Sequence, residues 1–342
     1  MSELVRSALA TIVDGGTLSM DEAHAAMGAV MDGEATPAQL AAFLMGLRMR
    51  GETADELAGF AAAMRDRVVR VDAPEGAIDV VGTGGDGSGT FNISTTAALV
   101  AAGAGAAVAK HGNRAASSAC GSADVLEQLG IALEQPPARI ARSIDEHGFG
   151  FMFARVHHPA MRHAAPVRQE LGTRTVFNVL GPLANPAGAR DGVFGVYSPS
   201  LARTYAETLA GLGARRALVV HGDGGLDELS PSGPSLVVEV DAGEIREWEL
   251  DPRSLGIYPS PPAEIQGGDA QANAEAVRRI LEGERSGRRD AVVLNAGAAI
   301  PAAGLVDDLG EGVEAAAAAL DSGAAAATLE RLVAFSLEKV PI

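Results

Sequence analysis

Apolar residues recur at helical spacing through the first 70 residues, which predicts four amphipathic helices. Two of them begin with the spacing of a capping box, in which each side chain bonds to the other residue's free backbone amide. These pairs are Ser19 with Glu22 and Thr53 with Glu56. A third helix is expected to begin at Thr36-Pro37, since threonine is a good cap and the fixed φ of proline suits the first turn. Residues 1–70 are therefore predicted to form a small helical domain.

From Ile78 onward, short runs of β-forming residues alternate with helical stretches, which predicts a mostly parallel sheet covered on both faces by helices. The expected strands are Ile78–Val81, Ala107–Lys110, Gly150–Phe153, Val193–Val196 and Ala217–His221. A hairpin of Leu236–Val240 and Glu244–Leu250 is expected to make the sheet mixed. Alanine-rich helices in residues 270–339 are expected to pack on it. The predicted fold is α/β: a small all-helical domain (1–70) followed by a larger α/β domain (71–342).

The formal net charge of −17 and the 4% aromatic content narrow the range of partners. Negative charge opposes general attraction to nucleic acid or anionic membranes, and few side chains could stack on bases. The longest apolar run, Ala97–Ala109, is too short to span a bilayer. The single cysteine, Cys120, allows no intramolecular disulfide and fits a reducing compartment. We therefore expect a cytoplasmic protein with no nucleic-acid or membrane partner.

Residues 79–96 carry the strongest signal for phosphate binding. A predicted strand runs into the glycines of Gly82–Gly87 and then into a helix that begins near Asn92. Glycines let backbone amides approach a phosphate, and a helix N-terminus stabilises its charge. The glycines also fit the dinucleotide-binding spacing, but the acidic residue expected at the end of the next strand is absent, because Lys110 stands there. Phosphate binding is therefore favoured over nicotinamide binding.

A second polar loop, Lys110–Asp124, follows the next predicted strand. Carboxyl ends of neighbouring parallel strands lie at one edge of a sheet, so both loops are expected to face the same ligand. Lys110 and Arg114 can neutralise phosphate, while Ser117 and Ser118 can donate hydrogen bonds. The seven histidines and the one cysteine show no recognisable zinc-binding spacing.

Several longer segments occur together in a specific order: Gly82–Gly87, Asn92–Thr95, Lys110–Arg114, Gly121–Glu127, His158–Arg162, Leu171–Pro186 and Leu226–Ser230. Through nearly the whole chain they resemble the anthranilate phosphoribosyltransferases. The resemblance implies a fold of the nucleoside phosphorylase/phosphoribosyltransferase type, in which a segment at about 165–185 returns to the helical domain. It implies magnesium-dependent transfer of a phosphoribosyl group from phosphoribosyl pyrophosphate (PRPP) to the amino group of anthranilate, in tryptophan biosynthesis. It also implies a homodimer that associates through the helical domain.

The resemblance further implies the members of the site. Those expected to hold PRPP are Gly82, Gly85, Asp86, Thr90, Asn92, Ile93, Ser94, Thr95, Lys110, His111, Gly112, Asn113, Arg114, Ala115, Ala116, Ser117, Ser118 and Ser122. Gly82, Asn113 and Arg168 are expected to contact anthranilate. Ser94, Asp227 and Glu228 are expected to hold two Mg²⁺ ions, directly or through water, which agrees with the preference of Mg²⁺ for oxygen ligands. Ala119-Cys120 departs from the family, where many relatives are expected to carry a lysine and a serine. No residue is identified as a general base.

Two other functions remain as alternatives. A pyrimidine nucleoside phosphorylase would have a similar helical domain and phosphate loop, but it would need no acidic metal pair. Gly85-Asp86 favours the transferase, because the phosphorylases are expected to carry a different residue after the second pair of loop glycines. A relative of this fold that binds nucleic acid is disfavoured by the negative charge.

Overall fold

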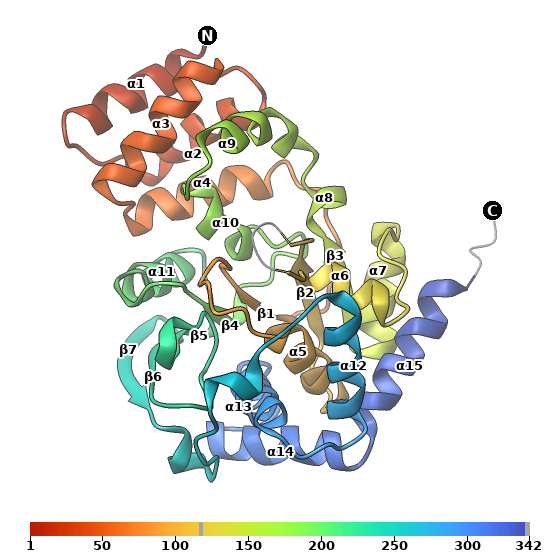
Figure 1. The fold of residues 1–342 in the computed structure, drawn as a ribbon. Helices are drawn as coiled ribbons and strands as arrows, with labels where there is room; N and C mark the ends of the chain where they lie inside the picture. Colours follow the sequence, from red (N-terminus) through yellow and green to blue (C-terminus); the bar gives the residue numbers. More distant parts are fainter. Residues whose placement is uncertain (116–118, 339–342) are drawn as a thin grey trace.

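The structure is a computed structural model that describes residues 1–115 and 119–338. Residues 1–70 form the predicted four helices, α1 (Glu3–Val13), α2 (Met20–Met31), α3 (Pro37–Arg50) and α4 (Ala54–Arg65). Both predicted capping boxes are present, at the starts of α2 and α4. Thr36 forms a further box with Gln39 at the start of α3. These helices pack side by side at one end of the molecule (Figure 1). The rings of Phe43 and Phe60 are buried among them.

Three short helices follow in the middle of the chain: α8 (Ala154–His157), α9 (Ala165–Leu171) and α10 (Phe177–Leu183). Helix α8 packs on β3, whereas α9 and α10 lie against the helical bundle. Helix α9 packs against α3, and α10 packs against α4 (Figure 1). Their buried residues, such as Val167 and Leu180, belong to the same apolar cluster as Phe43. The helical bundle is therefore completed by residues from far along the chain.

The described residues contain one mixed sheet of seven strands in the order β3-β2-β1-β4-β5-β6-β7. The strands are β1 (Ile78–Gly82), β2 (Val108–Gly112), β3 (Phe149–Phe153), β4 (Asp191–Gly195), β5 (Arg216–His221), β6 (Ser235–Asp241) and β7 (Glu244–Leu250). The first five are parallel, and β6 and β7 form the predicted antiparallel hairpin. Strand β4 starts two residues before the predicted position, at Asp191-Gly192, because pairing with β1 extends over residues of low strand propensity.

The helices around the sheet are α5 (Ile93–Gly103), α6 (Ser122–Gln128), α7 (Pro137–His147), α11 (Pro199–Gly211), α12 (Ala270–Leu281), α13 (Gly287–Ala302), α14 (Leu309–Asp321) and α15 (Ala324–Leu337). Helix α13 packs on β1, β4 and β5. The prediction that all the C-terminal helices pack on the sheet is wrong for α12, α14 and α15. Helix α12 packs mainly on α6, α14 packs on α13 and α5, and α15 packs mainly on α5. Small residues permit this outer layer, since a Cβ on Gly103 would lie 2.7 Å from Ala325 Cα.

The order of the strands indicates where a ligand can bind. From β1 the chain moves outward to β2 and β3, and then returns to the other side of β1 to form β4 and β5. In open α/β sheets, ligands bind at the carboxyl ends of the strands where the direction of winding reverses. Here that point lies between the ends of β1 and β4. Among the described residues, none of the helices combines the length and apolar character that a membrane span needs.

Candidate active site

Two glycines at the ends of β1 and β4 make room for an acidic loop. Gly82 and Gly195 are partners in the sheet register. A Cβ on Gly195 would lie 1.6 Å from the Asp227 carbonyl oxygen, and one on Gly82 would lie 2.2 Å from Asp227 Oδ2. The loop that carries Asp227 therefore fits between the two strand ends only because neither position has a side chain.

The glycine-rich loop after β1 folds around the same carboxylate. Gly84, Gly85 and Gly87 have φ between 72° and 76°, a region that other residues rarely adopt. This backbone brings Gly84 N to Asp227 Oδ2, to which it donates a hydrogen bond of 2.6 Å. The predicted phosphate loop and the predicted metal-binding acid are thus in direct contact.

The acidic pair lies in the loop after β5, behind a short 3₁₀ helix at Asp223–Gly225. The side chains of Asp227 and Glu228 are buried. Ser94 N, in the first turn of α5, donates to Glu228 Oε1 at 3.1 Å. The predicted magnesium ligands Ser94, Asp227 and Glu228 are therefore brought together.

Burial makes two neighbouring carboxylates unfavourable as anions in the absence of a cation. Burial and the nearby Asp86 raise the pKa of Asp227 to about 7, and burial and Asp227 raise the pKa of Glu228 to about 8. Within the described residues, no group of three or more acidic, histidine or cysteine side chains could hold a metal ion. A divalent ion would bind here through the two carboxylates, the Ser94 hydroxyl, water and ligand oxygens, which is the mixed oxygen shell that Mg²⁺ uses.

Lys110, on β2, is placed beneath the loops. Its side chain is 1% exposed, and Nζ donates to the Val80 carbonyl oxygen at 2.6 Å. Burial lowers its pKa, while the carboxylates of Asp79 and Glu228 act in the opposite direction. Its ammonium therefore compensates the charge of the acids. Direct contact between Lys110 and a phosphate stays a prediction.

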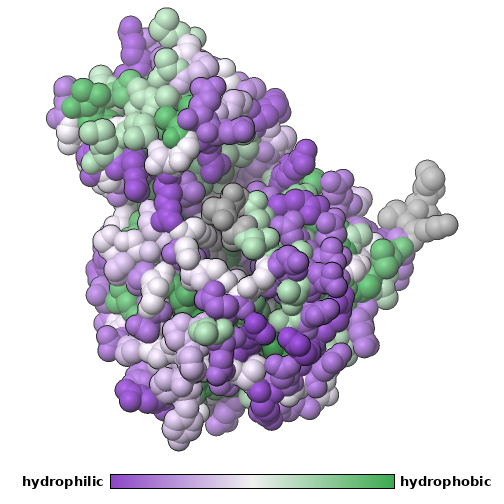
Figure 2. Space-filling model, in the orientation of Figure 1, coloured by the Kyte–Doolittle hydropathy of each residue, from purple (hydrophilic) through white to green (hydrophobic). Residues whose placement is uncertain are grey.

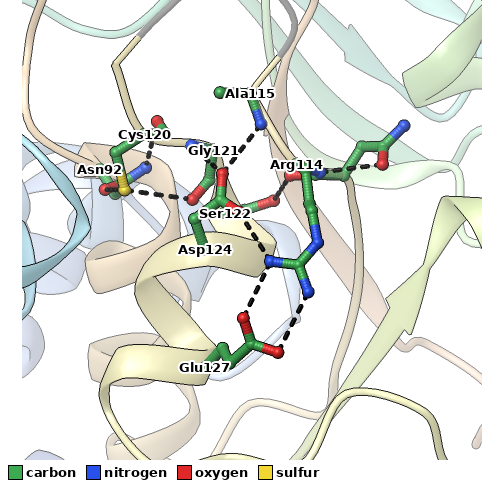
Figure 3. A network of polar contacts seen from close by, with 9 residues as sticks. Asn92, Arg114, Ala115, Cys120, Gly121, Ser122, Asp124 and Glu127 are labelled. Atoms are coloured by element: carbon green, nitrogen blue, oxygen red, sulfur yellow. Dashed lines mark hydrogen bonds and ion pairs between the residues drawn. The ribbon is translucent and has the colours of Figure 1, made fainter.

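The loop after β2 is tied to α6 by a polar network (Figure 3). The exposed Arg114 guanidinium forms ion pairs with Asp124 at 2.8 Å and Glu127 at 2.9 Å. Asp124 also accepts from the backbone amides of Ala115 and Gly121. Because two carboxylates already balance its charge, Arg114 would have to exchange one of these partners to bind a phosphate. Figure 3 shows the Arg114 guanidinium pointing toward the carboxylates of Asp124 and Glu127 on α6.

The same loop reaches back to the start of α5. Asn92 Nδ2 donates to the Cys120 carbonyl oxygen at 3.2 Å, and Cys120 Sγ donates to Asn92 Oδ1 at 3.3 Å (Figure 3). Ser122 Oγ donates to the Asn113 carbonyl oxygen at 3.2 Å. The two polar loops of the prediction are therefore joined by hydrogen bonds. Ala116, Ser117 and Ser118 lie outside the described residues.

Other predicted residues differ in how they could contribute. Ile93 and Thr95 are each 1% exposed, so only their backbones could contact PRPP. His111 is buried, and its Nε2 lies 3.2 Å from His158 Nε2. Gly112 is required because a Cβ there would lie 2.2 Å from Ser122 Oγ.

Two further predicted residues, Thr90 and Arg168, lie outside the contacts described so far. Thr90 forms an isolated bridge with Gln266 at the far side of the glycine-rich loop. Arg168, on α9, is partly buried, and its guanidinium carbon lies 5.2 Å from the centre of the Phe177 ring. Burial lowers its pKa. Within the described part of the chain, no hydrogen bond or ion pair links it to Gly82 or Asn113, so their joint contact with anthranilate stays a prediction.

Sequence reasoning missed Arg174, a cation beside the glycine-rich loop. Its guanidinium carbon lies 4.4 Å from the centre of the Tyr197 ring. Its Nη2 lies 3.0 Å from where a Cβ on Gly85 would stand. Among the described residues it forms no ion pair, so its charge is available beside this loop. The available signal was an arginine within Leu171–Pro186, a segment already singled out by its sequence.

Sequence reasoning also missed the support beneath the loops. Asn185 Nδ2 donates to Asp79 Oδ2 at 2.7 Å and to the Ala109 carbonyl oxygen at 2.8 Å. Asp79 is fully buried, and burial raises its pKa to about 6. This network links β1, β2 and the chain that leads into β4. An acidic residue inside an apolar strand was the signal that could have identified it.

Comparisons with known proteins agree with this architecture. Residues 6–68 match the helical bundle domain of a glycosyl transferase family, and residues 74–326 match the a/b domain of that family. The anthranilate phosphoribosyltransferase of Methylobacterium nodulans is 54% identical over 328 residues, which are 96% of this chain and 97% of that protein. That of Rubrobacter xylanophilus is 54% identical over 334 residues, 97% of this chain and 98% of that protein.

Solved structures give the same result. The crystal structure of anthranilate phosphoribosyltransferase from Thermus thermophilus has a TM-score of 0.92 and 51% identity, with 97% of this chain and 99% of that chain covered. The enzyme from Saccharomyces cerevisiae in complex with PRPP and Mg has a TM-score of 0.88 and 28% identity, with 98% of both chains covered. The chain therefore belongs to the anthranilate phosphoribosyltransferase family within these glycosyl transferases.

Proposed function

We propose that this protein transfers the phosphoribosyl group of PRPP to the amino group of anthranilate, giving N-(5-phosphoribosyl)anthranilate and pyrophosphate, in tryptophan biosynthesis. The observation that carries the proposal is the buried pair Asp227 and Glu228, held by amides of the glycine-rich loop and of the first turn of α5. The names of the relatives support the same reaction.

The reaction makes the anomeric carbon of PRPP positive while pyrophosphate leaves with negative charge. Ser94, Asp227 and Glu228 would hold Mg²⁺, for which a yeast relative in complex with PRPP and Mg is the precedent. When bound, Mg²⁺ neutralises charge on the diphosphate. The loop amides and the N-terminus of α5 add fixed dipoles to the same charge, and such preorganised groups need no rearrangement during the reaction.

Anthranilate needs positioning more than activation. Its amine is a neutral nucleophile at pH 7, so the proximity of the two substrates accounts for much of the rate. Arg168 is the proposed partner of its carboxylate, with Gly82 and Asn113 completing the contact. Arg168 lies on α9, which packs on the helical bundle, whereas the PRPP loops lie on the sheet. Anthranilate would then bind between the two parts of the molecule, with no residue assigned as a general base.

Several finer properties belong to the same proposal. The chain would divide near residue 70 into the helical domain, completed by residues 165–185, and the α/β domain. It would bind two Mg²⁺ ions per monomer, act as a homodimer joined through the helical domain, and function in the cytoplasm. Size-exclusion chromatography with light scattering tests the dimer, since a monomer at micromolar concentration would contradict it.

The decisive experiment follows anthranilate fluorescence in purified protein. We expect fluorescence to fall when both PRPP and Mg²⁺ are added, and to stay constant when either is omitted. Thymidine or uridine with inorganic phosphate forms the second arm, which tests the pyrimidine nucleoside phosphorylase alternative. Release of a free pyrimidine base without any loss of anthranilate would overturn the proposal.

A further inference from the structure

A polar cavity lies where the two parts of the molecule join, and none of the described residues of the loops above lines it. It measures about 350 Å³ and is lined by the end of α4, by the connection that follows it and by the loop before β4. The two connections are held together, since Val71 N donates to the Pro186 carbonyl oxygen at 3.2 Å. The cavity therefore forms where the segments joining the helical and α/β parts cross.

Three arginines line this cavity, in a protein whose net charge is strongly negative. They are Arg65, Arg70 and Arg190. Asp72 is the only acidic residue among those that line it, and it is exposed. Among the described residues, none of the three arginines takes part in an ion pair. Several other buried or half-buried arginines have a carboxylate partner, as Arg50 has in Glu56 and Arg289 has in Asp321.

Arg65, one of the residues that line the cavity, carries an unsatisfied buried N–H group. Its Nε donates to the Leu183 carbonyl oxygen at 2.7 Å, but its buried Nη2 has no hydrogen-bond partner. Arg190 Nη1 donates to the Leu212 carbonyl oxygen at 2.5 Å, which fixes the second guanidinium. Burial and the charge of Arg190 lower the pKa of Arg65 to about 10. A buried guanidinium without a partner is costly, and an anion would satisfy both its hydrogen-bonding capacity and its charge.

We infer that Arg65, Arg70 and Arg190 form a second binding site, for a phosphate group, at the junction of the two domains. Guanidinium groups bind phosphate oxygens through paired N–H donors. The three positive charges match the two negative charges of a phosphate better than they match the one charge of a carboxylate. The cavity has room for a phosphate monoester as well as for the free ion. The site goes beyond the proposed function, because its residues do not touch the loops that would hold PRPP.

Isothermal titration with inorganic phosphate, and separately with ribose 5-phosphate, tests the site. Saturating PRPP and Mg²⁺ are present without anthranilate, so that the first site is occupied, and sodium chloride keeps the ionic strength constant. We expect one bound phosphate group per chain. Loss of one charge-assisted contact should weaken its binding at least about 10-fold in Arg65→Met and in the double variant Arg70→Met with Arg190→Met.

Arg203→Met is the matched control, since Arg203 is an exposed arginine of α11 paired with Glu207. It should bind phosphate as the parent does. The double variant keeps the test valid if Arg65→Met fails to fold, because Arg70 and Arg190 are exposed. Equal affinity in the parent and in the folded arginine variants, equal loss in the Arg203 control, or no binding of either probe would overturn the inference. Failure of PRPP to bind would instead contradict the proposed function, and the arginine variants would still locate the phosphate.

Discussion

Asp227 and Glu228 illustrate how the site depends on single side chains. Both are buried and each accepts from a backbone amide, and Lys110 only partly offsets the effect of burial on Glu228, so burial disfavours both as anions until a metal cation binds. Their sequence neighbours give no hint of this, since an Asp-Glu pair in a loop usually lies in solvent. The family resemblance singled out the pair, and the structure supplies the physical reason.

Removing both charges should remove the dependence on Mg²⁺. In Asp227→Asn with Glu228→Gln, we expect kcat/KM to fall by about 100-fold or more, because metal neutralisation of a phosphate is worth several kcal/mol. Steady-state kinetics over a Mg²⁺ titration measures this. Glu247→Gln with Glu249→Gln, two exposed positions on β7, is the control and should behave as the parent. A double variant that kept the parent's rate and metal titration would exclude these acids as the metal site.

Arg168 should act on one substrate only. Arg168→Ala removes a charge-assisted contact of about 1.5–3 kcal/mol, so KM for anthranilate should rise by about 10- to 150-fold. KM for PRPP should change little, because the PRPP loops lie on the other side of the cleft proposed here. Arg203→Ala, which removes an exposed arginine of α11, is the control. Unchanged anthranilate kinetics would refute the assignment.

At the scale of the element, the close approach of the Asp227 loop to the ends of β1 and β4 requires glycine at both ends. Gly195→Ala should destabilise the protein by about 1–3 kcal/mol, since its Cβ would overlap a backbone atom of the Asp227 loop and overpacking costs this much. Activity should fall as well, because the acid would be displaced. Chemical denaturation and steady-state kinetics measure the two effects.

The matched change is Gly211→Ala at the end of α11, where a Cβ would meet nothing within 4 Å. The free energy of unfolding should rise there by up to about 0.5–1 kcal/mol, because alanine loses less backbone entropy than glycine in a helix. The two substitutions should therefore change the free energy of unfolding in opposite directions. Equal effects on unfolding at both positions would show that the close approach at Gly195 is not what matters.

Sequence patterns predicted the elements far better than their contacts. Periodicity and capping residues identified the four N-terminal helices, and runs of β-forming residues identified all seven strands to within about two residues at each end. The errors concern layers, because composition could not say that α14 packs on α13 and that α15 packs on α5 instead of on the sheet. A local sequence pattern does not indicate which element far along the chain a helix will pack against.

The sequence predicted which residues belong to the candidate site, but it did not predict the contacts between them. The sequence could not tell that Lys110 is enclosed, that Arg114 is already paired, or that Arg174 stands beside Gly85. Each depends on which loops meet at the ends of different strands. Such contacts are decided by the topology of the sheet and not by local propensity.

At the scale of the whole molecule, the net negative charge and the local cations act on an anionic substrate in opposite directions. The surface carries many hydrophilic residues in Figure 2, consistent with the net charge of −17. Cations that form no ion pair among the described residues lie where phosphate binding is proposed, with Arg174 beside the glycine-rich loop and three arginines at the domain junction. An anionic substrate therefore depends on these few groups for its affinity, since the protein as a whole repels it.

The buried acids should give the whole protein a pH-dependent response to Mg²⁺. The pKa values of Asp79, Asp227 and Glu228 are raised by burial to about 6, about 7 and about 8. A carboxyl whose pKa is higher in the folded than in the unfolded state stabilises the fold at low pH, and this stability is lost as pH rises through the folded value. Without Mg²⁺, Tm should fall as pH rises between about 6.5 and 9, a window above the titration of unperturbed histidine.

Mg²⁺ binds the deprotonated carboxylates, so the rise in Tm that it causes should grow with pH over the same window. Burial lowers the pKa values of His111 and His158. These histidines therefore change the stability of the fold at pH values below this window and do not affect the measurement within it. Scanning calorimetry of the parent and of Asp227→Asn with Glu228→Gln, with and without Mg²⁺, measures the difference. The double variant should lose most of the pH-dependent gain. A gain from Mg²⁺ that stayed constant from pH 6.5 to 9, or that persisted in the double variant, would mean that these buried carboxylates do not hold the ion.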